Sequence, residues 1–204
     1  MDNLNAILNY WFNDLDDKKI IDKNSQTVKR WFTKSPKTDE EILEKFESDF
    51  LKARQGGYKT WEESSRGRLA LVVLFDQFSR NMYRNSPKMF ATDALALNLT
   101  LRSIKDKKDC ELQLIERIFL YMPLMHAENP DMQKLSLKQF GFLAGESKTA
   151  SPQNVSYYEY TLTFAQRHHD IIEQFGRFPH RNKILKRDST PPEIEFLRKS
   201  GLGF

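Results

Sequence analysis

Residues 69–81 read LALVVLFDQFSRN and predict a helix at the centre of the fold. Residues 69–75 are apolar on every side of a helical wheel, and a helix of that kind is buried on most of its surface. Polarity returns at Asp76 and continues through Arg80 and Asn81. A charge on a core face must be paired. This helix end therefore either carries a structural ion pair between Asp76 and Arg80 or opens into a polar pocket.

Helical spacing of apolar residues extends outward from this stretch in both directions, and no alternating strand pattern with hairpin turns is found. We predict an all-α fold of about eight or nine helices in antiparallel pairs, a superhelical bundle similar to tetratricopeptide-repeat proteins. Five helices are expected over residues 7–12, 28–32, 62–81, 112–123 and 151–175, and the last two end at Pro123 and Gly176. Four more are expected from their start signals. These signals are a capping box at 38–41, whose helix stops at Gly56, a proline start at 85–87, another at 129–130, and a capping box at 190–193.

The composition bounds the class of protein. A chain of 204 residues with 39% apolar side chains fits one folded domain over residues 1–204 and excludes a disordered chain. A single cysteine, Cys110, excludes a disulfide framework and fits a cytoplasmic location. The longest apolar run is too short for a membrane span, so we expect no membrane partner. A net charge of +4 is mild, so we expect no nucleic-acid partner.

Several standard chemistries are missing from the sequence. There is no glycine-rich dinucleotide or phosphate loop and no G-x-S-x-G nucleophile motif. Cys110 lies between two acids, which disfavour a thiolate, so it is a poor nucleophile. The sequence therefore names no reaction by motif, and we predict no cofactor.

A basic loop after the expected helix end at Gly176 is the best candidate for binding an anion. Residues 177–187 hold five Lys or Arg side chains, one histidine and no acid. Arginine forks bind phosphate or carboxylate bidentately, and asparagine adds neutral hydrogen bonds. A solvated basic surface is the alternative for such a run. The ligand-binding candidates in this loop are Arg177, Arg181 and Asn182, with His180 beside them.

The histidines allow acid–base chemistry. His126 and Glu128, on an expected loop, could make an oriented pair, and His180 could polarise a substrate. His168 lies on the inward face of the long helix, where it is either a core side chain or a ligand-binding one. A metal site built from these four residues is an alternative that no fixed ligand spacing supports, so we predict no metal.

These segments together resemble the bacterial family catalogued as domain of unknown function 924, over nearly the whole chain. The resemblance implies an all-helical fold like that of the tetratricopeptide-repeat superfamily and supplies no established activity. Its motifs here are residues 61–71, 75–81, 121–128, 175–182 and 189–193, and its motif residues map onto Asp76, Arg80, Asn81, His126, Glu128, His168, Arg177, His180, Arg181 and Asn182.

Three positions depart from the family pattern. Ser79 stands where the family usually has proline, Ala127 where serine is common, and Lys186 where glycine is common. Lys186 adds a charge to the basic loop.

Three functions fit these observations. In the first, Arg80, Arg177 and Arg181 clamp an anionic small molecule or a peptide end. In the second, a hydrolase or transferase acts on a phosphorylated or carboxylated substrate, with His126 as the acid or base oriented by Glu128. In the third, the polar residues form a purely structural network. All three require Asp76 and His126 to converge beside the loop after Gly176, and none indicates an oligomeric state.

Overall fold

Helices of the α, 3-10 and π types build the fold in the computed structural model, which describes residues 3–13 and 15–200. Across these residues no strand occurs, so the predicted all-α class is confirmed. The described helices are slightly more numerous than the eight or nine predicted, because the single turns α5 (Ser79–Met82) and α10 (Asn182–Leu185) count as helices. The longer ones are α1 (Asn3–Phe12), α2 (Gln26–Phe32), α3 (Pro36–Arg54), α4 (Ser65–Val72), α6 (Asp93–Lys105), α7 (Leu114–His126), α8 (Pro130–Ala150), α9 (Val155–Phe175) and α11 (Pro191–Ser200).

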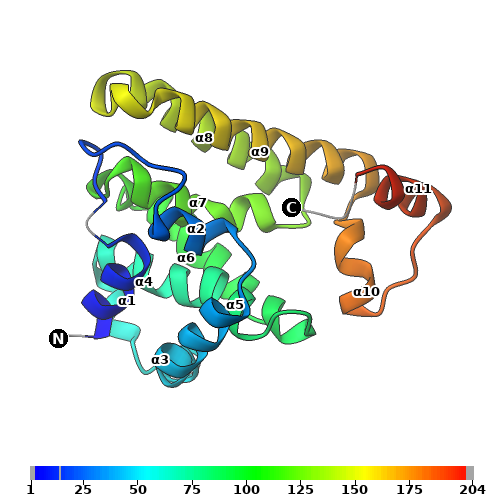
Figure 1. The fold of residues 1–204 in the computed structure, drawn as a ribbon, viewed down its shortest axis with the longest axis horizontal. Coiled ribbons are helices and arrows are strands. Elements are labelled where there is room, and N and C mark those ends of the chain that lie inside the picture. Colours follow the sequence, from blue (N-terminus) through cyan, green and yellow to red (C-terminus); the bar gives the residue numbers. More distant parts are fainter. Residues whose placement is uncertain (1–2, 14, 201–204) are drawn as a thin grey trace.

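The helices pack around α4 and α7. The long helices α8 and α9 run side by side along one side of the molecule, and α7 packs against α8 (Figure 1). On the other side of α7, α4 contacts α1 and α6. The short helices α10 and α11 lie at the far end of α9 (Figure 1). None of the described helices is both long enough and apolar enough to cross a membrane.

The predicted central helix is buried, but it is not a regular α-helix. Helix α4 is followed by the π-helical turn η2 (Val73–Phe78) and then by α5. The Ser79 N–H bonds to the Leu74 carbonyl, five residues back, which is the π pattern. Both Asp76 and Phe78 in this turn are fully buried. Such turns occur often at functional sites because they change where side chains point.

Several predicted helix ends are confirmed. Asn129 caps α8, Gly176 ends α9 in the left-handed conformation at φ +70°, and the Thr190 and Glu193 capping box opens α11. Gly176 fits this position because it has no Cβ to clash.

Other predicted ends are wrong. Helix α3 begins at Pro36 and is capped by Ser35, three residues before the expected capping box. Pro87 opens the 3-10 turn η3 (Pro87–Phe90) instead of α6. Helix α7 continues through Pro123 to His126, so His126 lies on the last turn of a helix and not on a loop.

The segment after Gly176 packs as a small unit at the end of α9. Phe178 is fully buried there against Ile171 and Ile172. On the outer side of this cluster, Phe196 of α11 stacks at a tilt on Phe175, with ring centroids 5.1 Å apart. The 3-10 turn η6 (Pro179–Arg181) therefore sits between this small cluster and the main body of the protein.

Candidate functional site

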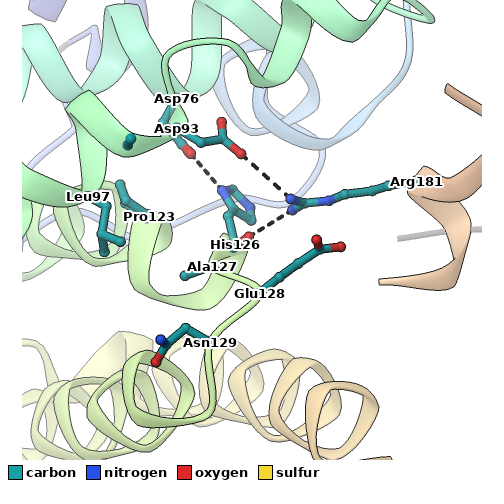
Figure 2. A pocket seen from close by; sticks show the side chains of 10 residues that line it. Asp76, Asp93, Leu97, Pro123, His126, Ala127, Glu128, Asn129 and Arg181 are labelled. Atoms are coloured by element: carbon teal, nitrogen blue, oxygen red, sulfur yellow. Dashed lines mark hydrogen bonds and ion pairs between the residues drawn. The ribbon is translucent and has the colours of Figure 1, made fainter. Parts of the chain in front are cut away.

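A cavity of about 280 Å³ lies where η2, α6, the end of α7 and η6 meet (Figure 2). This volume lies just below the usual range for small-molecule sites, about 300–1,000 Å³. One wall is apolar, and the rest carries charged and polar groups. The lining residues are Asp76, Asp93, Ala94, Leu97, Pro123, His126, Ala127, Glu128, Asn129 and Arg181.

Asp76 and His126 form a hydrogen-bonded pair in the wall of the cavity. The Asp76 Oδ1 atom lies 2.8 Å from His126 Nδ1, and Figure 2 shows the two side chains pointing toward each other. Asp76 also accepts a hydrogen bond from Gln77. The π turn brings Asp76 to this position, and α7 brings His126 to it because the helix runs on past Pro123.

The Asp76 carboxylate is charged although it is fully buried. Burial alone would raise its pKa, but Arg80 and His126 outweigh burial and lower the pKa to about 2. An ionised carboxylate can only accept, so Nδ1 of His126 carries a proton toward it. In the neutral imidazole the lone pair is then on Nε2. The His126 side chain is 17% exposed, so the ring is reachable from the cavity that it lines.

Arg80 and Arg181 share the carboxylate of Asp93. Arg80 binds Asp93 bidentately at 2.9 and 3.1 Å and also contacts Asp76 Oδ1 at 3.2 Å. Arg181 Nη1 lies 3.6 Å from Asp93 Oδ2. The predicted ion pair between Asp76 and Arg80 is therefore present, but Arg80 is mostly satisfied by two acids and does not line the cavity.

Arg181 is the arginine that reaches the cavity. Its Nη2 donates to the His126 carbonyl at 2.9 Å, and its guanidinium lies 4.7 Å from the Phe90 ring centroid and 4.6 Å from that of Phe178. Its Nε is buried and has no hydrogen-bond partner in the described part of the chain. Burial, and then the charge of Arg80, lower the pKa of Arg181 to about 10. Arg181 is therefore a buried cation with one hydrogen-bond donor that its surroundings leave unsatisfied.

Glu128 does not orient His126, so the acid–base pair predicted between these two residues is wrong. The Glu128 carboxylate binds Arg187 at 2.6 and 2.9 Å and accepts from the Phe178 backbone N–H at 2.7 Å. The reason is local: α7 ends at His126 and the backbone becomes extended at Ala127, so Glu128 is directed to the segment after Gly176. Asp76, from a distant part of the sequence, takes the orienting position.

Three predicted ligand-binding residues lie away from the cavity. Arg177 binds Glu193 bidentately at 2.7 and 2.8 Å, so it fixes α11 and is no part of a clamp. Asn182 donates to Ser189 and accepts from Arg187, which fixes the C-terminal segment. The remaining one, Asn81, donates to Asp39 on α3 at 2.9 Å.

His168 and His180 lie beside the cavity wall and are neutral. The His168 ring centroid is 6.2 Å from that of His126. His168 Nδ1 is 2.8 Å from the Phe164 carbonyl, so Nδ1 carries the proton. Burial lowers the pKa of His168 to about 3 and that of His180 to about 4.

The alternative metal site is not assembled. Among the described residues, His126, Glu128, His168 and His180 do not bring three ligand atoms within reach of one ion. A group of that kind does occur on α9, at His169, Asp170 and Glu173, where two of the three side chains are exposed. Exposed acidic groups are common without an ion, and nothing further at this surface points to a ligand.

Sequence reasoning missed two residues that organise the site, Asp93 and Arg187. Asp93 is the first residue of α6, where an acid is also favoured by the helix dipole, so its role as a bridge between two arginines has no local signal. Arg187 belongs to the basic run, and the absence of acids within that run was itself a sign that its partners are distant in sequence.

Fold and site together define an all-helical protein with a polar cavity that contains a paired histidine and a buried arginine. Residues 7–201 match the sequence pattern of a family described as bacterial protein of unknown function, DUF924, and the chain belongs to that family. This confirms the resemblance seen in the sequence. The similarity to tetratricopeptide-repeat proteins stays a prediction.

A solved structure is similar to this chain over almost its whole length. It is that of ATU0120, a protein of unknown function from Agrobacterium tumefaciens, with 30% sequence identity, a TM-score of 0.77 and 97% of each chain covered. The search of curated proteins gives no match.

Proposed function

We propose that the protein binds a small anionic molecule in the cavity, with Arg181 and His126 as the recognising groups. The observation that carries this proposal is Arg181 itself, a buried guanidinium that lines the cavity and has an unpartnered Nε. Buried polar groups are normally hydrogen-bonded, and a buried cation favours a nearby anion. A bound carboxylate or phosphate would supply the missing hydrogen-bond acceptor.

The proposed binding site uses fewer arginines than the three-arginine clamp expected from the sequence. Of the three arginines expected to hold the anion, Arg80 and Arg177 are engaged bidentately by Asp93 and Glu193. Arg181 contacts its carboxylate only at 3.6 Å. The anion is therefore recognised by one guanidinium and the neighbouring imidazole, which fits a small cavity better than a three-armed clamp.

A thermal-shift panel of carboxylates, phosphates and nucleotides tests the proposal. A ligand at ten times its Kd stabilises the folded state by about 1.4 kcal/mol, which raises the Tm of a chain of this size by about 3–6 °C. We expect such a shift for the wild type and for Arg177→Ala, whose changed side chain lies outside the cavity. Arg181→Gln should lose it while keeping the wild-type circular dichroism spectrum.

The opposite outcome has a clear meaning. If no anion in the panel shifts the wild type, or if Arg181→Gln responds as the wild type does, anion binding at the cavity is wrong. The polar residues would then form the structural network that is the third hypothesis.

A second candidate function, an acid–base enzyme of the hydrolase or transferase class, is favoured by the Asp76–His126 pair. A histidine oriented by a carboxylate and reachable from a cavity can take a proton from a substrate hydroxyl or from water. Turnover of carboxylated or phosphorylated compounds that is lost in His126→Gln, with ligand binding retained, would establish this function. Turnover that survives in His126→Gln would refute it.

A further inference from the structure

We propose that the ligand is a small monocarboxylate with an apolar part, and that it binds together with one proton, which His126 takes up. This inference rests on the proposed anion-binding function and names the ligand class of that same cavity. It follows from the charges around the cavity, counted group by group.

The charged side chains around the cavity balance one another. Three carboxylates and three guanidiniums are linked by contacts of 3.6 Å or less, and their sum is zero when His126 is neutral. The contacts pair Asp76 with Arg80, Asp93 with Arg80 and Arg181, and Glu128 with Arg187.

An anion that enters this neutral cluster brings one uncompensated negative charge into a mostly buried place. A buried charge is costly unless it is paired, so the complex favours gain of one positive charge. His126 is the group that can provide it, because its ring lines the cavity and its Nδ1 already faces the ionised Asp76. A protonated imidazole would donate from Nδ1 to Asp76 and from Nε2 to the ligand.

The other titratable groups that face His126 cannot supply this charge. They are Asp76 on η2, Arg80 on α5, Asp93 on α6, Glu128 after α7, His168 on α9, His180 and Arg181 on η6, and Arg187 beyond α10. The acids and arginines among them are already paired with one another. Burial keeps His168 and His180 neutral, since it lowers their pKa values to about 3 and about 4.

One available proton limits the charge of the ligand. A phosphate dianion would leave one negative charge uncompensated beside Asp93 and Glu128, which already line the cavity. A carboxylate carries a single negative charge, which the one positive charge gained by His126 balances. The apolar wall of Ala94, Leu97 and Pro123 suits a short hydrocarbon or a ring.

Benzoate and phenylphosphonate test the ligand class, because they share an apolar ring and differ in charge at pH 8. NMR titration should show that benzoate binds and that phenylphosphonate binds at least tenfold more weakly at pH 8. Benzamide, which has no charge, should not bind. Tighter binding of phenylphosphonate than of benzoate would overturn the monocarboxylate class.

The pH dependence of benzoate binding tests the proton. If one proton is taken up on binding, the Kd of benzoate rises about tenfold for each unit by which the pH is raised. Nitrogen-15 spectra of the histidine side chains at pH 8, in a cationic buffer such as Tris, should show His126 becoming protonated as benzoate is added. His126→Gln should weaken binding and remove its pH dependence between pH 7 and 9. His169→Gln, on α9 outside the cavity lining, should change neither.

The possible failures are distinct. If benzoate binds with a Kd that does not change between pH 7 and 9, the proton uptake is wrong while anion binding stands. If neither benzoate, phenylphosphonate nor inorganic phosphate binds, the proposed function itself is wrong.

Discussion

Replacing Asp76 by asparagine should destabilise the protein strongly at neutral pH. Asp76 is fully buried and contacts both Arg80 and His126. Its pKa of about 2 in the folded protein lies below the ordinary value of 3.8. At 1.36 kcal/mol per pKa unit, the charged form contributes about 2–3 kcal/mol to the free energy of unfolding.

The sign of the pH dependence follows from the lowered pKa. The unfolded chain binds the proton more tightly, so the contribution is complete above about pH 5 and is lost as the pH falls from 3.8 toward 2. The difference between wild type and Asp76→Asn should therefore shrink by about half near pH 3.

Urea unfolding followed by tryptophan fluorescence measures both effects. Asp39→Asn is the matched control, because Asp39 also binds an arginine and an asparagine but is partly exposed. We expect a loss of about 1 kcal/mol for this control. A loss below about 1 kcal/mol for Asp76→Asn, or a loss that does not decrease toward pH 3, would refute the buried ion pair as described.

Three further predictions follow from single contacts. Lys186→Gly should raise the Tm by about 2–4 °C, because Lys186 ends α10 at φ +54°, where glycine avoids a cost of about 1 kcal/mol; an unchanged Tm in a melting curve would contradict this. Glu128→Gln should speed hydrogen exchange at the Phe178 amide at least tenfold, because it weakens the carboxylate that holds Phe178 and Arg187, while exchange in α4 should not change. The lowered pKa of the buried His168 should make the free energy of unfolding fall by about 1.4 kcal/mol for each pH unit below 6.5, because the unfolded chain gains the proton first. His168→Gln should reduce the slope of the free energy of unfolding against pH, between pH 6.5 and 5, by the equivalent of one proton. An unchanged slope would contradict this.

The sequence predicted those parts of the fold whose signals are local. Asn129 before a proline, Gly176 after a helical run and the Thr190 to Glu193 capping box each satisfy the helix end on which they lie. The apolar run at residues 69–75 correctly indicated a buried central helix.

The π turn and the length of α7 could not be read locally. A π turn keeps the composition of an α-helix, and only the register of its hydrogen bonds differs, so nothing near Asp76 distinguishes the two. Pro123 usually marks a helix end, but α7 tolerates it and carries His126 into the cavity wall.

From the sequence one could predict which distant segments converge, but not which of their side chains form pairs. The sequence correctly expected Asp76 and His126 to converge near the loop after Gly176, and Arg181 joins them there. It paired His126 with Glu128, two residues away, whereas the fold supplies Asp76 from fifty residues away. It also could not foresee that Glu193, the acid of a capping box, would engage Arg177.

Lys186 shows how a departure from the family pattern acquires a physical meaning. The residue adopts the left-handed conformation at the end of α10, which explains why glycine suits this position. The departure at Ser79 has a different consequence. The Ser79 hydroxyl donates to the Phe75 carbonyl at 2.6 Å, which a proline could not do, and so it ties the π turn to α5.

A crystal structure with p-bromobenzoate would test the central claim most directly, because the anomalous signal of bromine locates the ligand independently of the protein. We predict the bromine against the apolar wall near Leu97 and the carboxylate within hydrogen-bond distance of Arg181 and His126. Bromine found only on the outer surface of the basic segment at residues 177–187, with no ligand in the cavity, would contradict the account.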